Sequence, residues 1–351
     1  MSKPPALHDI AVIAPNLKRR LSGVTTTVVR LIPLQARSIG IVTTGPGLPP
    51  DLPRLPLWRC VLLPRNRWRV WHARRNTEMA LGLILRHLFR RRLKLLFTSA
   101  AQRHHKPFTK WLIRQMDRVV ATSPQAASYL DVPATVILHG VDCTIFRPTA
   151  DKQALRRALG LPEDALLIGC FGRVRAQKGV DLMVDAALAL MPTRPDVQMI
   201  FTGRVTDDQR GFFDEQMARL TAAGLTGRVR FLGELGWDDV ARHYQALDLF
   251  CAPARWEGFG LTPLEAMASG VPAVAARVGA FEALIGDGVT GSLVPPGDAP
   301  ALTEAIRGWI DDRPRLAAAG PVARAHVEAN HRIEGEAERL LSVYRDMLGP
   351  E

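Results

Sequence analysis

Short apolar runs alternate with longer segments of helical pattern along the whole chain, and this alternation restricts the fold more than any other feature. The first half contains such runs at 8–14, 39–44 and 93–97, and the second half repeats them at 165–171 and 197–203. Short apolar runs indicate buried strands, and helical segments between them bring consecutive strands into parallel pairs. The rhythm predicts an α/β chain with parallel, doubly wound sheets.

The length of 351 residues is too great for one core of ordinary size, so we expect two domains. No apolar run approaches the ~18–20 residues needed to span a bilayer, and we expect no signal peptide at the N-terminus. The four cysteines lie far apart without a C-x-x-C pair, which favours free thiols over a zinc site or disulfides. These features predict a protein of a reducing, cytoplasmic compartment.

Charge is divided unevenly between the two halves. Residues 1–150 hold 24 Lys and Arg against 6 Asp and Glu, a net charge of +18. Residues 151–351 hold 22 against 28, a net charge of −6. Such a division indicates an anionic partner for the first half: a membrane surface, a lipid headgroup or a nucleic acid.

The segment 253–271, PARWEGFGLTPLEAMASGV, follows an apolar run and ends in an alanine-rich helical pattern. It carries Glu257 and Glu265 with seven residues between them, and Gly258 and Gly260 follow the first glutamate. Glycines let backbone amides approach a ligand, and a helix start offers N–H groups to an anion. Carboxylates accept hydrogen bonds from hydroxyls, so the segment fits a ligand with sugar and phosphate. The alternative is a strand–loop–helix corner whose glutamates are merely solvated.

This E-x7-E segment resembles that of the retaining glycosyltransferases of family 4. The resemblance implies the GT-B fold, in which two Rossmann-like doubly wound domains face each other across a cleft. The phrase HGVDCTIFRP at 139–148 resembles the interdomain linker of that family. We therefore expect an acceptor-binding domain at 1–147 and a nucleotide-sugar-binding domain at 148–332. By the same resemblance, a C-terminal helix within 333–351 packs back on the first domain.

Two cations follow a predicted strand in the phrase FGRVRAQKG. Rossmann-like sheets bind ligands outside the carboxyl ends of their strands, so Arg173 and Lys178 are positioned for a diphosphate. The alternative is that both are simply solvated. They match the family pattern R…KG, which implies that they stabilise the leaving nucleoside diphosphate as it gains negative charge. Because the chain has no D-x-D pair of the kind that holds a catalytic metal, we expect no metal, and we expect no cofactor.

The resemblance also implies roles for the residues around these cations. Glu265 accepts hydrogen bonds from the nucleotide ribose, and Glu257 lies beside the donor sugar and takes part in catalysis with the two cations. The donor-binding set also contains one glycine of the first domain and four loop residues: Gly23, Gly258, Phe259, Gly260 and Leu261. The implied reaction is a front-face substitution with retention, in which the departing phosphate oxygen helps to deprotonate the acceptor.

The first domain supplies the expected acceptor contacts. His104 and His105 follow a predicted strand, and in relatives a histidine at such a place approaches the sugar. The resemblance thus implies a catalytic role for His105 and an acceptor contact for His104, although either can be an ordinary core or surface histidine. The basic loop after the first strand adds three acceptor or membrane contacts: Lys18, Arg19 and Arg20.

Cations and apolar residues, among them Trp71, recur at helical spacing in the segment 70–92, which we expect to be a helix following a strand at 58–64. Interfacial helices pair a Trp/Phe/Leu face with a Lys/Arg face, so the segment predicts binding to an anionic membrane. The alternative is a core-facing apolar stripe with a solvated basic face. Three consecutive arginines carry the membrane prediction: Arg90, Arg91 and Arg92.

The stretches KRRLSGVTTTV and FTSAAQRHHKPFTK are similar to bacterial lipopolysaccharide-core mannosyltransferases. That resemblance implies transfer of mannose from GDP-mannose to the Kdo of a lipid A precursor, by a peripheral enzyme on the inner face of the cytoplasmic membrane. A UDP-sugar-dependent hexosyltransferase acting on another lipid or saccharide keeps every motif and stays open. A basic nucleic-acid-binding protein explains the charge but not EGFGLTPLE or the cation pair, so we expect no nucleic-acid partner.

Overall fold

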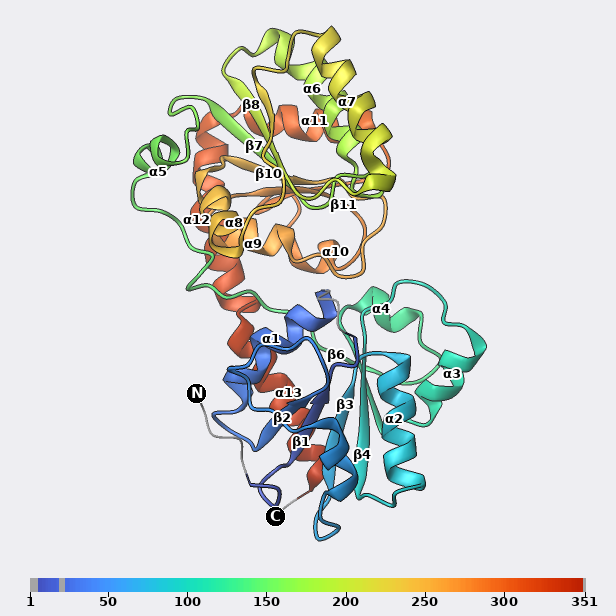
Figure 1. Cartoon of the computed structure of the whole chain (residues 1–351). Helices are drawn as coiled ribbons and strands as arrows, with labels where there is room; N and C mark the ends of the chain where they lie inside the picture. Colours follow the sequence, from blue (N-terminus) through green and yellow to red (C-terminus); the bar gives the residue numbers. More distant parts are fainter. Residues whose placement is uncertain (1–5, 19–22, 350–351) are drawn as a thin grey trace. The chain divides into compact units, whose positions relative to one another are not determined.

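The computed structural model describes residues 6–18 and 23–349. The chain divides into two compact units, one made of Met1–Leu138 with Ile333–Glu351 and the other of His139–Arg332 (Figure 1). The division falls before the HGVDCTIFRP phrase, whereas the sequence placed it at residue 147. Phe146 explains the difference, because it is buried against aromatic rings of the second unit.

The first unit is built on a parallel sheet with the strand order β2-β1-β3-β4-β5-β6. Its strands are β1 (Val12–Pro15), β2 (Ile41–Thr44), β3 (Arg69–Ala73), β4 (Leu93–Ser99), β5 (Arg118–Ala121) and β6 (Thr135–Val136). All the pairings between these strands are parallel. Their carboxyl ends therefore lie along one edge of the sheet.

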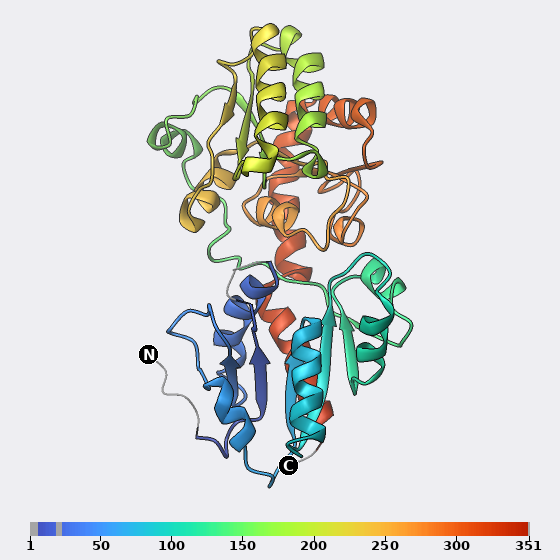
Figure 2. The ribbon, with the colours of Figure 1, turned by 45° about the vertical axis from the view of Figure 1, so that its right-hand side comes forward.

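Helices cover both faces of this sheet (Figures 1 and 2). The described helices are α1 (Gly23–Gln35), η1 (Leu57–Leu62), α2 (Asn76–His87), α3 (Pro107–Arg114), α4 (Pro124–Ser128) and α13 (Ile333–Leu348). Val12 and Ala14 of β1 share a core with α1 and α13, and Ile13 shares a core with α2 and α3. This alternation follows from the two-residue period of a strand, whose side chains point to opposite faces.

Two expectations for this unit are wrong. The segment 58–64 forms most of the 3-10 helix η1 instead of a strand, and the helix expected over 70–92 begins only after the strand β3. Trp71 lies in that strand and is fully buried, so it is a core residue and not part of an interfacial stripe. Arg69 is also buried, and its Nη1 donates to the carbonyl of Pro64 at 2.6 Å. All five residues of β3 are buried, so the strand lacks the alternation of buried and exposed residues that marks a strand in a sequence.

The last helix, α13, is anchored in the first unit by a buried polar contact. The Tyr344 hydroxyl lies 2.7 Å from Nδ1 of His72 on β3, and Nε2 of the same ring lies 2.7 Å from the hydroxyl of Thr98 on β4. Burial lowers the pKa of His72 well below 6.5 and raises the pKa of Tyr344 to about 12. Both groups are therefore neutral, and α13 completes the core of the first unit.

The second unit has its own parallel sheet, with the order β12-β11-β10-β7-β8-β9. Its strands are β7 (Leu166–Phe171), β8 (Val197–Thr202), β9 (Val229–Phe231), β10 (Leu249–Ala252), β11 (Ala273–Ala276) and β12 (Gly291–Val294). The described helices are α5 (Lys152–Ala158), η2 (Ala176–Lys178), α6 (Val180–Leu190), η3 (Met191–Thr193), η4 (Asp207–Gln209), α7 (Arg210–Ala222), α8 (Trp237–Ala246), α9 (Thr262–Ala268), α10 (Phe281–Leu284), α11 (Ala299–Ile310) and α12 (Arg313–Asn330). The helices α6, α7 and α11 share a core with β7 and β8.

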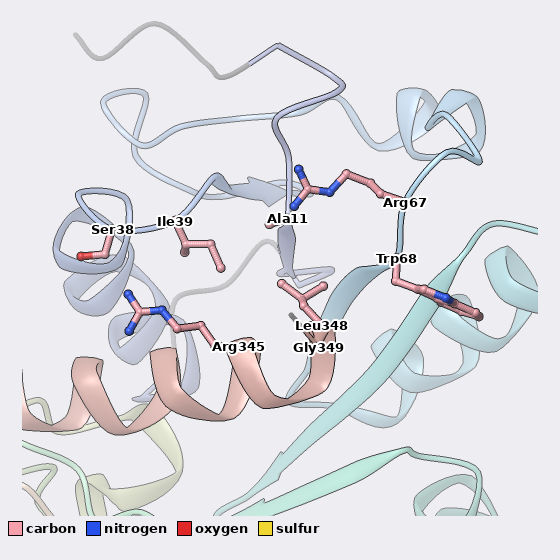
Figure 3. A pocket seen from close by; sticks show the side chains of 8 residues that line it. All are labelled: Ala11, Ser38, Ile39, Arg67, Trp68, Arg345, Leu348 and Gly349. Carbon is pink, nitrogen blue, oxygen red and sulfur yellow. The ribbon is translucent and has the colours of Figure 1, made fainter. Parts of the chain in front are cut away.

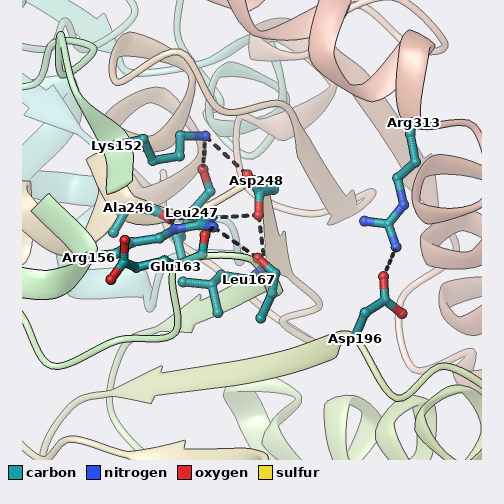
Figure 4. Close-up of polar contacts among 10 residues, drawn as sticks. Lys152, Arg156, Glu163, Leu167, Asp196, Ala246, Leu247, Asp248 and Arg313 are labelled. Carbon is teal, nitrogen blue, oxygen red and sulfur yellow. Dashed lines mark hydrogen bonds and ion pairs between the residues drawn. The ribbon is translucent and has the colours of Figure 1, made fainter. Parts of the chain in front are cut away.

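A charged cluster fastens α5 to the amino ends of β7 and β10 (Figure 4). Arg156 is buried and donates to the carbonyl of Ala246 at 2.8 Å and to Asp248 Oδ2 at 2.7 Å. Lys152 Nζ donates to the other oxygen of Asp248 at 3.1 Å. The two cations of α5 thus share one carboxylate, just before the start of β10. These contacts hold α5 against the amino ends of the strands.

A pocket of about 800 Å³ opens at the amino end of the first unit's sheet (Figure 3). Its lining includes Ala11, Ile39 and Trp68, which lie just before β1, β2 and β3, together with Arg67 and Arg345. Parallel α/β sheets bind their ligands beyond the opposite, carboxyl ends of the strands. A substrate site is therefore expected at that other edge in each unit.

Candidate functional site

In the second unit, the loops after β7 and β10 meet at the carboxyl edge of the sheet. The two strands are neighbours, with Ile168 paired to Leu249 and Gly169 to Phe250. At the far end of the first loop, Gly179 has a φ of 73°, and a Cβ on it would lie 2.1 Å from the carbonyl oxygen of Pro253 in the second loop. Only glycine permits this approach.

Lys178 and Glu257 face each other across these two loops. Lys178 Nζ donates to Glu257 Oε2, and the other carboxylate oxygen accepts the backbone N–H of Gly258 at 3.1 Å. Both side chains line a small pocket whose floor includes Cys170 and Cys251. The pocket's volume of about 10 Å³ leaves room for about one water molecule, so a larger ligand does not fit inside it.

The glycine loop after Glu257 is compact. Gly260 has a φ of 84°, and a Cβ there would lie 2.3 Å from the ring of Phe281. Phe259 is buried, its carbonyl accepts the N–H of Ala280 at 3.0 Å, and its ring lies edge-on to His139 with centroids 4.7 Å apart. The loop therefore has a defined backbone before α9 begins, just after Leu261.

Glu265 lies on α9 and is nearly buried, at 7 % exposure. The hydroxyl of Tyr244, on α8, donates to Glu265 Oε2 at 3.1 Å. Burial, followed by the charge of this carboxylate, raises the pKa of Tyr244 well above 10. Tyr244 thus holds the carboxylate in one orientation, and sequence reasoning missed it because nothing near residue 244 marks it as a partner.

Arg173 lies in the same loop as Lys178 but is exposed. No hydrogen bond or ion pair of its guanidinium involves another described residue. It directly follows Gly172, at the carboxyl end of β7. The structure thus brings Arg173, Lys178, Glu257 and the glycine loop to one edge of one sheet.

Arg255 is a second residue that the sequence did not single out. Its guanidinium makes two parallel hydrogen bonds to Asp181, Nη1 to Oδ1 at 2.8 Å and Nη2 to Oδ2 at 2.7 Å. Its backbone N–H donates to the carbonyl of Gln177 at 2.8 Å. The two loops are thus joined beside Lys178 and Glu257.

In the first unit, the candidate residues follow the carboxyl ends of β1 and β4. Lys18 is exposed, Arg19 and Arg20 lie outside the described residues, and Gly23 begins α1. His105 Nε2 lies 3.4 Å from the hydroxyl of Ser99, the last residue of β4.

The two histidines differ in surroundings. Burial, with the nearby charges of Arg103 and Lys110, lowers the pKa of His105. His104 is exposed and lies edge-on to Tyr129, with ring centroids 5.2 Å apart. At neutral pH His105 is therefore the neutral imidazole.

A buried glutamate, also missed from the sequence, organises the loop after β1. Glu78 is fully buried and accepts hydrogen bonds from the backbone N–H of Arg74 and from Nη1 of Arg75, both at 2.8 Å. The same Arg75 nitrogen donates to Asn16 Oδ1 at 2.8 Å, and Asn16 Nδ2 donates to the carbonyl of Lys18 at 2.9 Å. This chain of contacts fixes the start of the basic loop.

The arginine cluster lies in the turn between α2 and β4, not on a helix. Arg90 and Arg92 are exposed, whereas Arg91 Nη1 donates to the carbonyl of Leu63 at 2.7 Å. Large apolar side chains are also exposed on this unit, Leu88 in the same turn and four others outside it: Trp58, Trp68, Phe108 and Trp111. The rings of the last two stack with centroids 6.0 Å apart.

The described part of the chain lacks two features, a metal-binding cluster and a membrane-spanning helix. Between residues 6 and 349, leaving out 19–22, no three His, Cys, Asp or Glu side chains are grouped as metal ligands. Over the same residues, no helix has the length and apolarity to cross a membrane.

Comparisons with known proteins bear on this site. Residues 151–326, which contain the Lys178–Glu257 pair, match the family described as Glycosyl transferases group 1. The chain is 52% identical over 351 residues to the lipopolysaccharide core biosynthesis mannosyltransferase LpcC of Rhizobium leguminosarum bv. viciae, covering 98% of this chain and 99% of the relative. It is 49% identical to LpsB of Rhizobium meliloti, which carries the same description, with coverage of 97% and 99%. Among solved structures, Anabaena HepE in complex with UDP superposes with a TM-score of 0.82 at 20% identity, covering 95% of this chain and 99% of that one.

Proposed function

Because this chain belongs to the glycosyl transferases group 1 family and is a glycosyltransferase of the GT-B fold, we propose that it transfers mannose from GDP-mannose, with retention, onto the Kdo of a lipid-linked lipopolysaccharide core precursor. Two relatives of about half identity over nearly the whole chain are described as lipopolysaccharide core mannosyltransferases, which supports the sugar and the pathway. Family membership also favours an enzyme over the basic nucleic-acid-binding alternative.

The observation that carries the proposal is the pairing of Lys178 with Glu257 at the carboxyl ends of β7 and β10. An ammonium and a carboxylate held together at a sheet edge match a ligand with phosphate at one end and sugar hydroxyls at the other. Lys178 and the exposed Arg173 bind the diphosphate and stabilise the charge that it gains as it leaves. Glu257 accepts hydrogen bonds from the hexose, and the loop from Gly258 to Leu261 lines the sugar.

Glu265 has a separate task in this proposal. Since its Oε2 is held by Tyr244, the carboxylate is pre-oriented to accept hydrogen bonds from the ribose hydroxyls. With one glutamate on the ribose, the two do not form the opposed carboxylate pair of a retaining glycosidase. Transfer then proceeds on one face of the sugar, and the departing phosphate oxygen takes the acceptor proton.

The acceptor belongs to the first unit in this proposal. Kdo and its lipid carry carboxylate and phosphate groups, which complement the excess of Lys and Arg in residues 1–150. His105 is a neutral imidazole near the end of β4 and can accept a hydrogen bond from a sugar hydroxyl; His104, Lys18 and Gly23 lie at the same edge. The exposed tryptophans and the arginine cluster hold the enzyme peripherally on the anionic inner face of the cytoplasmic membrane.

Heat protection by sugar nucleotides tests the donor. A ligand that binds only the folded state raises the melting temperature, so GDP-mannose and GDP should stabilise the protein, and UDP-glucose and UDP-galactose should not. The product formed from GDP-mannose should keep the α configuration of the donor in proton NMR. The UDP complex of the structural neighbour makes the opposite result worth testing. If UDP-sugars protected the protein and GDP-mannose did not, the proposal would change to a UDP-sugar-dependent hexosyltransferase.

A further inference from the structure

We propose that Arg255 is a positioning residue, which holds Lys178 against Glu257 through its bidentate contact with Asp181. The inference rests on the proposed role of Lys178 in binding the diphosphate. Arg255 stands two residues before Glu257, and Asp181 stands three residues after Lys178. The Arg255–Asp181 contact therefore links the segment that carries Lys178 to the segment that carries Glu257.

The link has contacts on both sides of Lys178. Before it, the carbonyl of Ala176 accepts Arg255 Nη1 at 2.5 Å, and the carbonyl of Gln177 accepts the Arg255 N–H at 2.8 Å. After it, Asp181 accepts both guanidinium nitrogens. The Gln177 side chain makes a hydrogen bond in the opposite direction: its Nε2 donates to the carbonyl of Trp256 at 2.9 Å. Arg255 and its neighbour Trp256 thus form hydrogen bonds with residues on both sides of Lys178.

Lys178 needs such support because its own backbone is weakly determined. It ends η2, a 3-10 turn of three residues, and the left-handed Gly179 follows. Short 3-10 turns have poor hydrogen-bond geometry, and glycine adds conformational freedom. Tertiary contacts therefore help to decide where the ammonium group points, and Arg255 supplies those to the two preceding residues, Ala176 and Gln177.

The chemistry of the pair suits a positioning role. A guanidinium and a carboxylate in a fork-to-fork arrangement fix direction as well as distance, which a lysine cannot do. Asp181 lies in the first turn of α6, where a negative charge is favoured by the helix dipole, and its bond raises the pKa of Arg255. The Arg255 and Asp181 side chains are 38% and 23% exposed, so the pair adds little to global stability.

A double-mutant cycle in GDP affinity tests the inference. Arg255→Met should weaken GDP binding about 10-fold and lower kcat, because the diphosphate contact of Lys178 is no longer held in place. Asp181→Asn should do the same, and Arg255→Lys should recover only part of the loss. In a Lys178→Ala background, Arg255→Met should have no further effect, because there is no ammonium left to position.

The matched control is Arg194→Met. Arg194 makes an equivalent two-bond contact to Asp311, at 2.8 and 2.7 Å, before the amino end of β8. Its loss should leave GDP affinity and kcat unchanged, with a similar small change in melting temperature. Titration calorimetry with GDP, and with UDP in parallel, supplies the affinities.

The outcomes separate two kinds of failure. If Arg255→Met weakens binding equally in the wild-type and Lys178→Ala backgrounds, Arg255 acts independently of Lys178 and the positioning inference is wrong. An unchanged affinity in Arg255→Met also overturns it. If Lys178→Ala itself leaves the affinity for both nucleotides unchanged, the diphosphate role in the proposed function fails, and the inference falls with it.

Discussion

At the scale of single residues, the two glutamates of the E-x7-E segment occupy different surroundings. Glu257 is paired with a cation, whereas Glu265 is nearly buried and held by a neutral hydroxyl. Removing Glu257 therefore frees Lys178, while removing Glu265 leaves the Tyr244 hydroxyl without its acceptor. The same substitution should have different consequences at the two positions.

We expect Glu265→Ala to weaken GDP binding, because the proposed ribose contact exists without the sugar. Glu257→Ala should leave GDP affinity unchanged, because its proposed partner is the hexose and the Arg255 contacts still hold the loop of Lys178, but it should lower kcat by about 10²-fold, because the hexose is no longer held for transfer. Calorimetry with GDP and steady-state turnover with GDP-mannose separate the two effects. Equal losses of GDP affinity in both variants would show that this division of roles is wrong.

The sequence located some of these residues and could not locate others. Glu257, Glu265, Arg173 and Lys178 were found because fixed spacing along the chain carries the signal. Arg255 and Asp181 were not, because 74 positions separate them and neither stands in a pattern of its own. Partners made by tertiary contact leave no local trace in one sequence, which also explains why Tyr244 and Glu78 were missed.

At the scale of elements, the parallel strands were predictable and the first-unit segment around residue 70 was not. The buried strands of the second unit, such as β7 and β10, are short apolar runs, so period and length identify them. The strand β3 contains Arg69 and His72, whose partners lie outside the strand. A polar residue in a strand is readable only once its partner is known, and the apparent helical period was the result.

The neutral His72 between β3 and α13 predicts a pH dependence of stability. The pKa of His72 in the folded state lies well below 6.5, so the unfolded state binds more protons than the folded state. The contribution of the neutral imidazole to the free energy of unfolding is therefore complete above pH 6.5 and is lost as the pH falls below that value. The free energy of unfolding changes by about 1.4 kcal/mol per pH unit over the range in which His72 is protonated only in the unfolded state. The melting-temperature difference between wild type and His72→Gln should therefore shrink from pH 7.5 to pH 5.

The control for that experiment is the exposed histidine His87, at the end of α2. The His87→Gln variant should follow wild type at each pH. A difference between wild type and His72→Gln that stays constant over this range would mean that the buried imidazole is not the titrating group.

At the scale of the whole molecule, the charge of residues 1–150 predicts salt-dependent membrane binding. Association with anionic vesicles should be strong at low salt and weaken as salt rises, because exposed charges are screened beyond about 10 Å at 0.1 M. Arg90→Glu combined with Arg92→Glu should reduce flotation with vesicles; Arg91 is left intact because it bonds to the Leu63 carbonyl. Hydrolysis of the donor should persist, since Arg173, Lys178, Glu257 and Glu265 lie in the second unit.

The matched control reverses two exposed arginines of the second unit, Arg210→Glu and Arg242→Glu. It changes the net charge equally but leaves the arginine cluster unchanged, so flotation should stay close to wild type. Equal losses in both double variants would assign binding to net charge alone, and unchanged flotation in both would remove the membrane proposal.

The position of α13 has a consequence for how the protein is made. The second unit is continuous from His139 to Arg332, so all of its residues are synthesised before Ile333–Leu348. The first unit is translated earlier, yet Tyr344, Leu340 and Ile333 of its core arrive last. First-domain-first folding, the usual vectorial order, therefore cannot be completed for this unit. One face of its sheet lacks part of its core until Ile333–Leu348 has been synthesised and has left the ribosome.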